Sequence, residues 1–168
     1  MKKFLIATVL FVFVFNLNTK AQTTQDKRIR VVAVFAHPDD ADSKMGGTAA
    51  LLAKMGVAVK FVALTNGDAG HYAEGGGVLG QRRREEAQRA AKKYGIDEYV
   101  VLNNHDGELL PDLNVRMQVI REIRKWNADV VFGLRPNDYH PDHRNAGKLV
   151  EDASYMVAVP NVAADVPA

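Results

Sequence analysis

The 168 residues suit a single domain, with 22 lysines and arginines against 20 aspartates and glutamates and a formal net charge of +2. The complete lack of cysteine excludes disulfides and any metal site built from thiolates. The near balance of charge excludes the strongly basic surface on which nucleic-acid binding depends.

The N-terminus has the order of a secretory signal peptide. A basic start is followed by the almost wholly apolar residues 4–15, and small residues precede a cleavage point after Ala21. The apolar run is short for a membrane span, although an uncleaved anchor is the alternative. We expect residues 1–21 to be removed and residues 22–168 to be exported, periplasmic or secreted, without stable membrane insertion. Removal takes three lysines and no acid, so 19 basic residues face 20 acidic ones and the net charge becomes −1.

Beyond this leader, apolar runs typical of buried strands alternate with segments of helical periodicity. The predicted strands cover residues 29–36, 57–64, 99–102 and 129–134. The predicted helices cover residues 46–55, 82–94, 115–126 and 145–157, and the glycine-rich residues 65–80 predict a long loop. This alternation indicates right-handed βαβ units, and therefore an α/β, Rossmann-like three-layer fold with a mostly parallel sheet.

A polar cluster follows each predicted strand. The four clusters are residues 37–40, 65–68, 104–107 and 135–143. In open α/β sheets ligands bind beyond the carboxyl ends of the strands, so all four clusters are expected at one edge of the sheet. The functional site is predicted there.

Two of these clusters carry ligands for a metal. They contain the motifs AHPDD at residues 36–40 and HPDH at residues 140–143, which together hold three of the five histidines. We predict His37, Asp40 and His143 as ligands of one zinc ion, since two imidazoles and a carboxylate leave a tetrahedral ion one open position for water. Another divalent transition metal could use the same ligands.

The remaining residues of the two motifs suit acid–base chemistry. Asp39 is the predicted general base, and His140 could stabilise an oxyanion or protonate a leaving amine. Asp142 could orient His140 or support a ligand histidine. Taken singly, an Asp-Asp pair before a helix is often only an N-cap, and His-Pro is often only a turn. The occurrence of both motifs at one predicted edge favours a metal-dependent hydrolase.

These motifs resemble the LmbE-like, or PIG-L, family of zinc-dependent N-acetylglucosaminyl deacetylases. The resemblance covers about residues 31–157 and also includes Gly-Gly-Thr at 46–48, Leu-Thr-Asn-Gly-Asp at 64–68 and Arg83-x-x-Glu86. It implies the same zinc ligands, general base and electrostatic histidine that the residue chemistry suggests. It also implies that Arg83 binds the sugar, and we add Asp68 and Asp106 from the same edge as predicted substrate-binding residues.

The resemblance implies hydrolysis of the N-acetyl group of an N-acetylglucosamine-type amino sugar, or of a related amide, by metal-activated water. The sequence departs from the family pattern at Asp42, where the family usually has glutamate, and at Ser43-Lys44, where it has an aliphatic residue and glycine. Family members usually continue beyond the position of Ala168, so the domain is expected to be shortened at its C-terminus.

Two other functions compete with this one. The first is a non-catalytic carbohydrate-binding protein on the same scaffold. The second is a metal phosphoesterase, which would usually need two metal ions where the sequence offers ligands for one. An open sheet edge in a shortened chain also makes a homo-oligomer a reasonable expectation.

Overall fold

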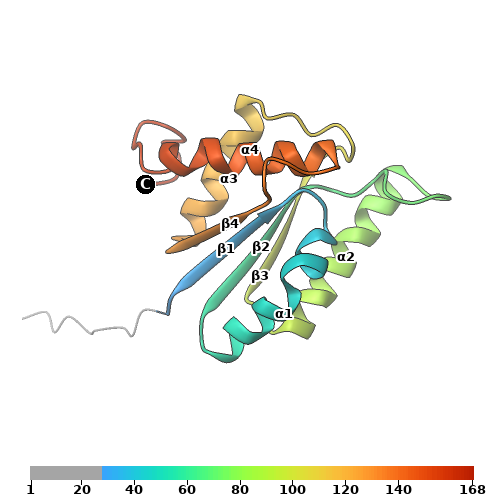
Figure 1. Cartoon of the computed structure of the whole chain (residues 1–168), viewed down its shortest axis with the longest axis horizontal. Helices are drawn as coiled ribbons and strands as arrows, with labels where there is room; N and C mark the ends of the chain where they lie inside the picture. Colours follow the sequence, from blue (N-terminus) through green and yellow to red (C-terminus); the bar gives the residue numbers. More distant parts are fainter. Residues whose placement is uncertain (1–27) are drawn as a thin grey trace, which may run out of the picture.

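The computed structural model describes residues 28–168, so the predicted signal peptide lies outside the described residues. Four strands and four helices alternate along this part of the chain (Figure 1). The strands are β1 (Arg30–Phe35), β2 (Ala58–Thr65), β3 (Glu98–Asn104) and β4 (Val130–Gly133). The helices are α1 (Asp40–Lys54), α2 (Gly76–Tyr94), α3 (Leu113–Trp126) and α4 (Pro141–Met156). Among the described helices, none has the length and apolar character needed to cross a membrane.

The strands form one parallel sheet in the order β3-β2-β1-β4, which confirms the predicted α/β class. In its register, Val31 of β1 lies between Val59 of β2 and Val130 of β4. The chain builds outward from β1 through β2 to β3 and then crosses back to the other side of β1. The strand order therefore reverses between β1 and β4, and α/β proteins bind ligands at this kind of switch point.

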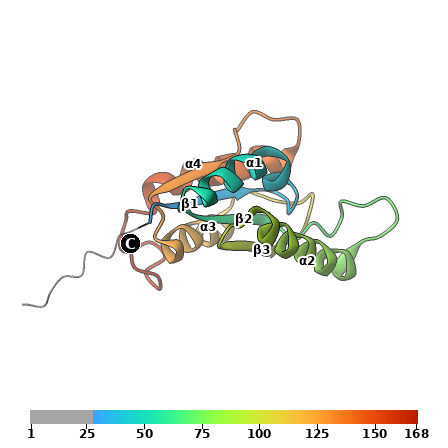
Figure 2. The same cartoon turned by 90° about the horizontal axis from the view of Figure 1, so that it is seen from below.

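Helices cover both faces of the sheet, with α1 and α2 on one side and α3 and α4 on the other (Figures 1 and 2). Val32 and Val34 of β1 belong to the core under α3 and α4, whereas Val31, Ala33 and Phe35 belong to the core under α1 and α2. Because alternate residues of a strand point to opposite faces, a strand buried on both faces is apolar throughout. That explains the unbroken valine-rich run in the sequence.

The outer strand β4 is much less covered than β1. Its residues Val130, Val131 and Phe132 are 40%, 38% and 44% exposed. Within the described residues β4 pairs only with β1, so its other edge is open. Such an edge can pair with another strand, and self-association stays a prediction.

All four helices begin earlier than the sequence pattern predicted, α3 by only two residues, at Leu113 instead of 115, and the other three by more. Helix α1 begins at Asp40 instead of residue 46, α2 at Gly76 instead of 82, and α4 at Pro141 instead of 145. The missed first turns are polar or glycine-rich and show no apolar period, although acidic residues and proline are favourable at helix N-termini. The difference matters because Asp40 and His143 belong to the first turns of helices, where the backbone is fixed, and not to loops.

Gly147 allows α4 to approach the end of β4 closely. A Cβ at this position would lie 2.5 Å from the carbonyl oxygen of Leu134, a contact that side-chain atoms do not tolerate. Glycine is therefore required by the close packing of α4 on the backbone beyond β4. This packing places the start of α4 beside the end of β1.

Candidate metal centre and active site

A cavity of about 440 Å³ opens at the carboxyl edge of the sheet. It is lined by residues from the turns after β1, β2 and β3, from the first turns of α1 and α4, and from α2. Seven of the nine predicted site residues line it: His37, Asp39, Asp40, Arg83, Asp106, His140 and His143. Asp68 and Asp142 are absent from the lining of this cavity, in the part of the chain that the structure describes.

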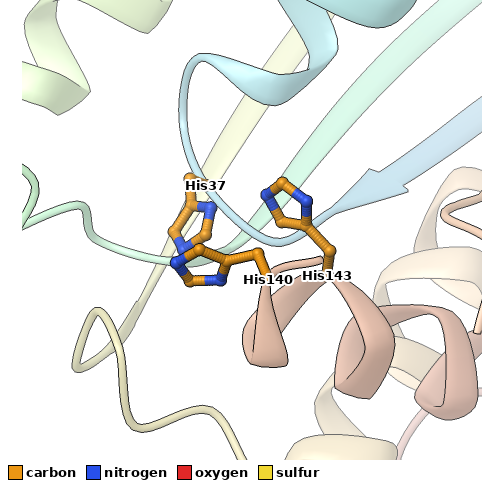
Figure 3. A group of neighbouring side chains, drawn as sticks. All are labelled: His37, His140 and His143. Atoms are coloured by element: carbon orange, nitrogen blue, oxygen red, sulfur yellow. The ribbon is translucent and has the colours of Figure 1, made fainter. Parts of the chain in front are cut away.

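Three imidazoles meet at this cavity (Figure 3). His37 follows β1, while His140 immediately precedes α4 and His143 lies in its first turn. The ring centroid of His37 lies 4.8 Å from that of His140 and 5.2 Å from that of His143, and the latter two are 4.8 Å apart. One ring nitrogen from each of the three lies within 4.8 Å of the others. The two motifs therefore meet at one edge of the sheet, as the sequence predicted, and they do so across the switch point between β1 and β4.

The buried carboxylate of Asp40 lies between two of these histidines. Its Oδ2 is 3.2 Å from Nδ1 of His37, and its Oδ1 is 3.1 Å from Nε2 of His143. Burial by itself would raise the pKa of Asp40, but hydrogen bonds from His37 and Lys44 outweigh it and hold this pKa well below its usual range. Two imidazoles and an ionised carboxylate in mutual contact fit a divalent transition metal such as zinc.

Each candidate ligand histidine has a carboxylate on its other ring nitrogen. Nε2 of His37 lies 3.0 Å from Oδ1 of Asp106 and 3.4 Å from Oδ2 of Asp142, and Nδ1 of His143 lies 3.0 Å from Oδ1 of Asp138. Carboxylates in this position fix the tautomer and orientation of metal-binding histidines. Sequence reasoning missed Asp138, because nothing in its spacing distinguishes it from an ordinary turn residue.

The carboxylates also change the protonation of His37. Burial alone would lower the pKa of this imidazole, but its hydrogen bonds to Asp106 and Asp40 outweigh burial and raise the pKa to about 10. His37 therefore carries two protons at neutral pH when no metal is bound. Since a metal binds only the neutral imidazole, binding has to release one of these protons.

Asp39 occupies the N-cap position of α1, yet its side chain makes no capping hydrogen bond to the described residues. The carboxylate is exposed at the cavity beside Asp40. The alternative in which Asp39 serves only as a helix cap thus lacks its defining hydrogen bond. A free carboxylate next to the candidate metal ligands is positioned to accept a proton from water.

His140 is held by its own helix. Its Nδ1 accepts a hydrogen bond from the backbone N–H of Asp142 at 3.2 Å, so the neutral ring carries its proton on Nε2. An Nε2–H group can donate to a substrate oxygen but has no lone pair for a metal. This favours His37, Asp40 and His143 as the ligand set, with His140 beside it.

Two predicted residues lie behind the cavity wall. Asp68 accepts from the backbone N–H of Asp106 at 3.0 Å and lies 2.8 Å from Nδ1 of His105, so it holds the loop that carries Asp106. Asp142 is 1% exposed and accepts from the backbone N–H of Gly107 at 2.8 Å. Asp68 thus acts on His37 through Asp106, whereas Asp142 contacts the His37 ring directly.

Arg83 of α2 lines the same cavity as the histidine motif at the start of α4. Its guanidinium pairs with the Glu86 carboxylate at 2.9 Å and lines the cavity together with Gly67 and Gly70. An arginine in this place can donate to hydroxyl or carbonyl oxygens of a ligand.

An open, parallel α/β sheet with a histidine–carboxylate centre at its switch point defines a Rossmann-like protein with a candidate catalytic metal site. The chain belongs to the PIG-L family, described as GlcNAc-PI de-N-acetylase, whose pattern it matches over residues 32–154. Among its relatives, the diacetylchitobiose deacetylase of Thermococcus kodakarensis is 34% identical over 79% of this chain and 51% of its own length.

Solved structures agree with this assignment. The N,N'-diacetylchitobiose deacetylase of Pyrococcus horikoshii superposes with a TM-score of 0.76 at 32% identity, over 86% of this chain and 56% of that one. The 4-carboxy-2-hydroxymuconate hydratase GalB of Pseudomonas putida KT2440 gives a TM-score of 0.72 at 25% identity, over 80% of this chain and 59% of that one. The chain thus spans little more than half the length of these relatives.

Proposed function

We propose that this chain forms the catalytic domain of a zinc-dependent N-deacetylase acting on an N-acetylglucosamine-type amino sugar. The observation that carries the proposal is the Asp40 carboxylate in contact with both His37 and His143, at the edge of a cavity. Membership of the PIG-L family and the diacetylchitobiose deacetylases among its relatives support the substrate class. Zinc is favoured because two imidazoles and one carboxylate suit its catalytic sites.

The residues around the candidate metal site suit the steps of amide hydrolysis. Zinc held by His37, Asp40 and His143 would supply a Lewis acid that polarises the acetamide carbonyl and acidifies water. Asp39 accepts a proton as the water oxygen bonds to the carbonyl carbon. The Nε2–H of His140 donates to the carbonyl oxygen while negative charge develops there.

The same groups complete the reaction. When the carbon–nitrogen bond breaks, Asp39 returns its proton to the departing amine nitrogen, and the second product is acetic acid, which ionises to acetate at neutral pH. Arg83, which lines the same cavity, binds the hydroxyl groups of the sugar. Asp106, Asp138 and Asp142 act through the histidines that they contact and do not need to touch the substrate.

The direct test is acetate released by the purified chain with added zinc from a panel of N-acetylglucosamine compounds, with Asp39→Asn as the matched inactive variant. Release that disappears in Asp39→Asn supports the deacetylase. Saturable sugar binding without acetate release would favour the carbohydrate-binding alternative. Because a related hydratase shares the fold, acetate is a better readout than substrate loss, since a hydratase releases none.

We further propose that the protein is exported through residues 1–21. The basic start, the short apolar run and the small residues before position 22 support this proposal. The substrate would then be a glycan of the cell envelope or one taken up from outside. N-terminal sequencing of the protein from a cell fractionation tests it, because a mature chain that starts at Gln22 is expected outside the cytoplasm.

A further inference from the structure

Lys44 contacts the carboxylate at the centre of the candidate metal site. It lies four residues after Asp40 on α1, and its Nζ donates to Oδ1 of Asp40 at 2.7 Å. The same oxygen is the one that lies 3.1 Å from Nε2 of His143. The other oxygen, Oδ2, accepts the backbone N–H of His37 at 2.9 Å. The ammonium group therefore binds the carboxylate oxygen that faces the second ligand histidine.

Lys44 can give up its contact with Asp40 without disturbing the core. The Lys44 side chain is 38% exposed and lines the cavity, whereas Asp40 is buried and fixed in the first turn of α1. A long, partly exposed lysine can turn its charge into the solvent at small cost. The Asp40 carboxylate cannot move with the lysine, because it is buried in the first turn of α1.

We propose that Lys44 competes with the metal for Asp40 and so weakens the metal affinity of this site. This inference rests on the ligand set of the proposed function. An ammonium on the ligating oxygen must shift when a cation binds there, and two cations close to one carboxylate repel each other. Lys44 is therefore an affinity-setting residue, and the site exchanges its metal more readily than the same ligands would alone.

The sign of the effect separates this role from its obvious rival. If Lys44 instead held Asp40 in place for the metal, its removal would weaken metal binding, as the loss of an outer hydrogen-bond partner usually does. Competition predicts the opposite result, because removal leaves the carboxylate unneutralised and its metal-facing oxygen free.

The experiment is a zinc titration of the purified full chain against a chromophoric chelator. Lys44→Met removes the charge and keeps the length of the side chain, and Lys44→Arg keeps the charge. Lys54→Met, in the exposed last turn of the same helix, is the matched control. We expect Lys44→Met to bind zinc about tenfold more tightly than the natural chain, and the other two variants to stay within about twofold of it.

A salt series adds a second readout. The difference between Lys44→Met and the natural chain should shrink between about 0.05 M and 0.5 M salt, because salt screens a partly exposed charge. Thermal unfolding with chelator present shows whether each variant folds, and Lys44→Gln repeats the test with a polar side chain if Lys44→Met does not.

The Asp40→Asn variant separates the two proposals. Weaker or unchanged zinc binding by Lys44→Met, with binding abolished in Asp40→Asn, overturns the competition and leaves the metal site standing. Zinc binding by Asp40→Asn as tight as that of the natural chain overturns the ligand set, and with it the proposed function.

Discussion

The carboxylate of Asp106 lies 3.0 Å from Nε2 of His37, on the side of the ring that faces away from Asp40. Asp106 follows β3 and His37 follows β1, so the contact spans the width of β2. Asp68, which follows β2, accepts the backbone N–H of Asp106 and holds it in place. Three strand ends thus cooperate to orient one imidazole.

Asp106→Asn should weaken zinc binding by about 10- to 100-fold, because an amide of the same shape no longer supports the basicity of the histidine. Chelator competition measures the affinity. Glu108→Gln, an exposed acid two residues away, is the control and should leave the affinity unchanged. A normal zinc affinity in Asp106→Asn together with a raised KM would restore the substrate-binding role predicted from the sequence.

Asp39→Asn should lower kcat for acetate release by about 10²- to 10⁴-fold, the usual contribution of a general base. Zinc affinity should stay within about twofold of the natural value, because Asp39 is not in the proposed ligand set. Stability should change by less than about 0.5 kcal/mol, because the side chain makes no capping hydrogen bond to the described residues.

The assignment of Asp39 and Asp40 can be checked with one more variant. If Asp39→Ala loses the metal and Asp40→Ala retains it, ligand and base have been exchanged in our interpretation. Zinc content after dialysis measures this directly.

The metal-free chain should lose stability on the alkaline side. The folded-state pKa of His37 is raised to about 10 from an ordinary value of 6.5, so the fold favours the protonated ring. The resulting stabilisation is complete below about pH 6.5 and is lost as the pH rises through about 10. Urea unfolding with chelator present, at several pH values from 6 to 10, should show a loss on the order of a few kcal/mol that His37→Gln lacks.

Zinc provides the control for this effect. The metal-bound histidine has already lost the proton, so the zinc-loaded chain should hold its stability over the same pH range better than the metal-free chain. Parallel alkaline losses in the natural chain and in His37→Gln would show that other groups cause them.

Glu122→Gln should destabilise the fold by about 3 kcal/mol, because it removes the main counter-charge of a buried lysine. Lys60, which is 2% exposed in β2, lies 2.7 Å from the Glu122 carboxylate, and Glu98 lies farther away at 3.2 Å. Urea unfolding at pH 7 measures the change. The control is Glu151→Gln, which breaks an exposed pair with Lys148 and should cost less than about 1 kcal/mol. An equal effect of both variants would mean that Glu98 alone neutralises Lys60.

The alternation of strands and helices could be predicted because each element carries its own local pattern. The valine-rich run of β1 is apolar since both faces of that strand are buried, and the glycine after α2 ends that helix in a left-handed conformation. The motifs around His37 and His140 were recognisable for a similar reason. Histidine and aspartate, residue types that commonly bind metals, stand next to strand ends, where α/β sheets bind their ligands.

Helix starts were harder to predict, because a first turn made of polar residues and glycine shows no apolar period. The burial of Lys60 was equally hidden, since it depends on Glu122, which lies 62 residues later in the sequence. A charged residue in an apolar run does not reveal whether its partner is a carboxylate or water.

The local sequence determined which segments form strands and which residues can bind a metal, because periodicity and side-chain chemistry are properties of short stretches. The tertiary structure decided that β4 lies beside β1, that Asp106 and Asp138 contact His37 and His143, and that the Asp40 oxygen bound by Lys44 also faces His143. The contacts of Asp106 with His37 and of Asp40 with His143 join residues far apart in the sequence. They depend on the strand order and on how α4 packs against β4. Both result from the burial of the whole sheet between two helix layers, which no short stretch of sequence encodes.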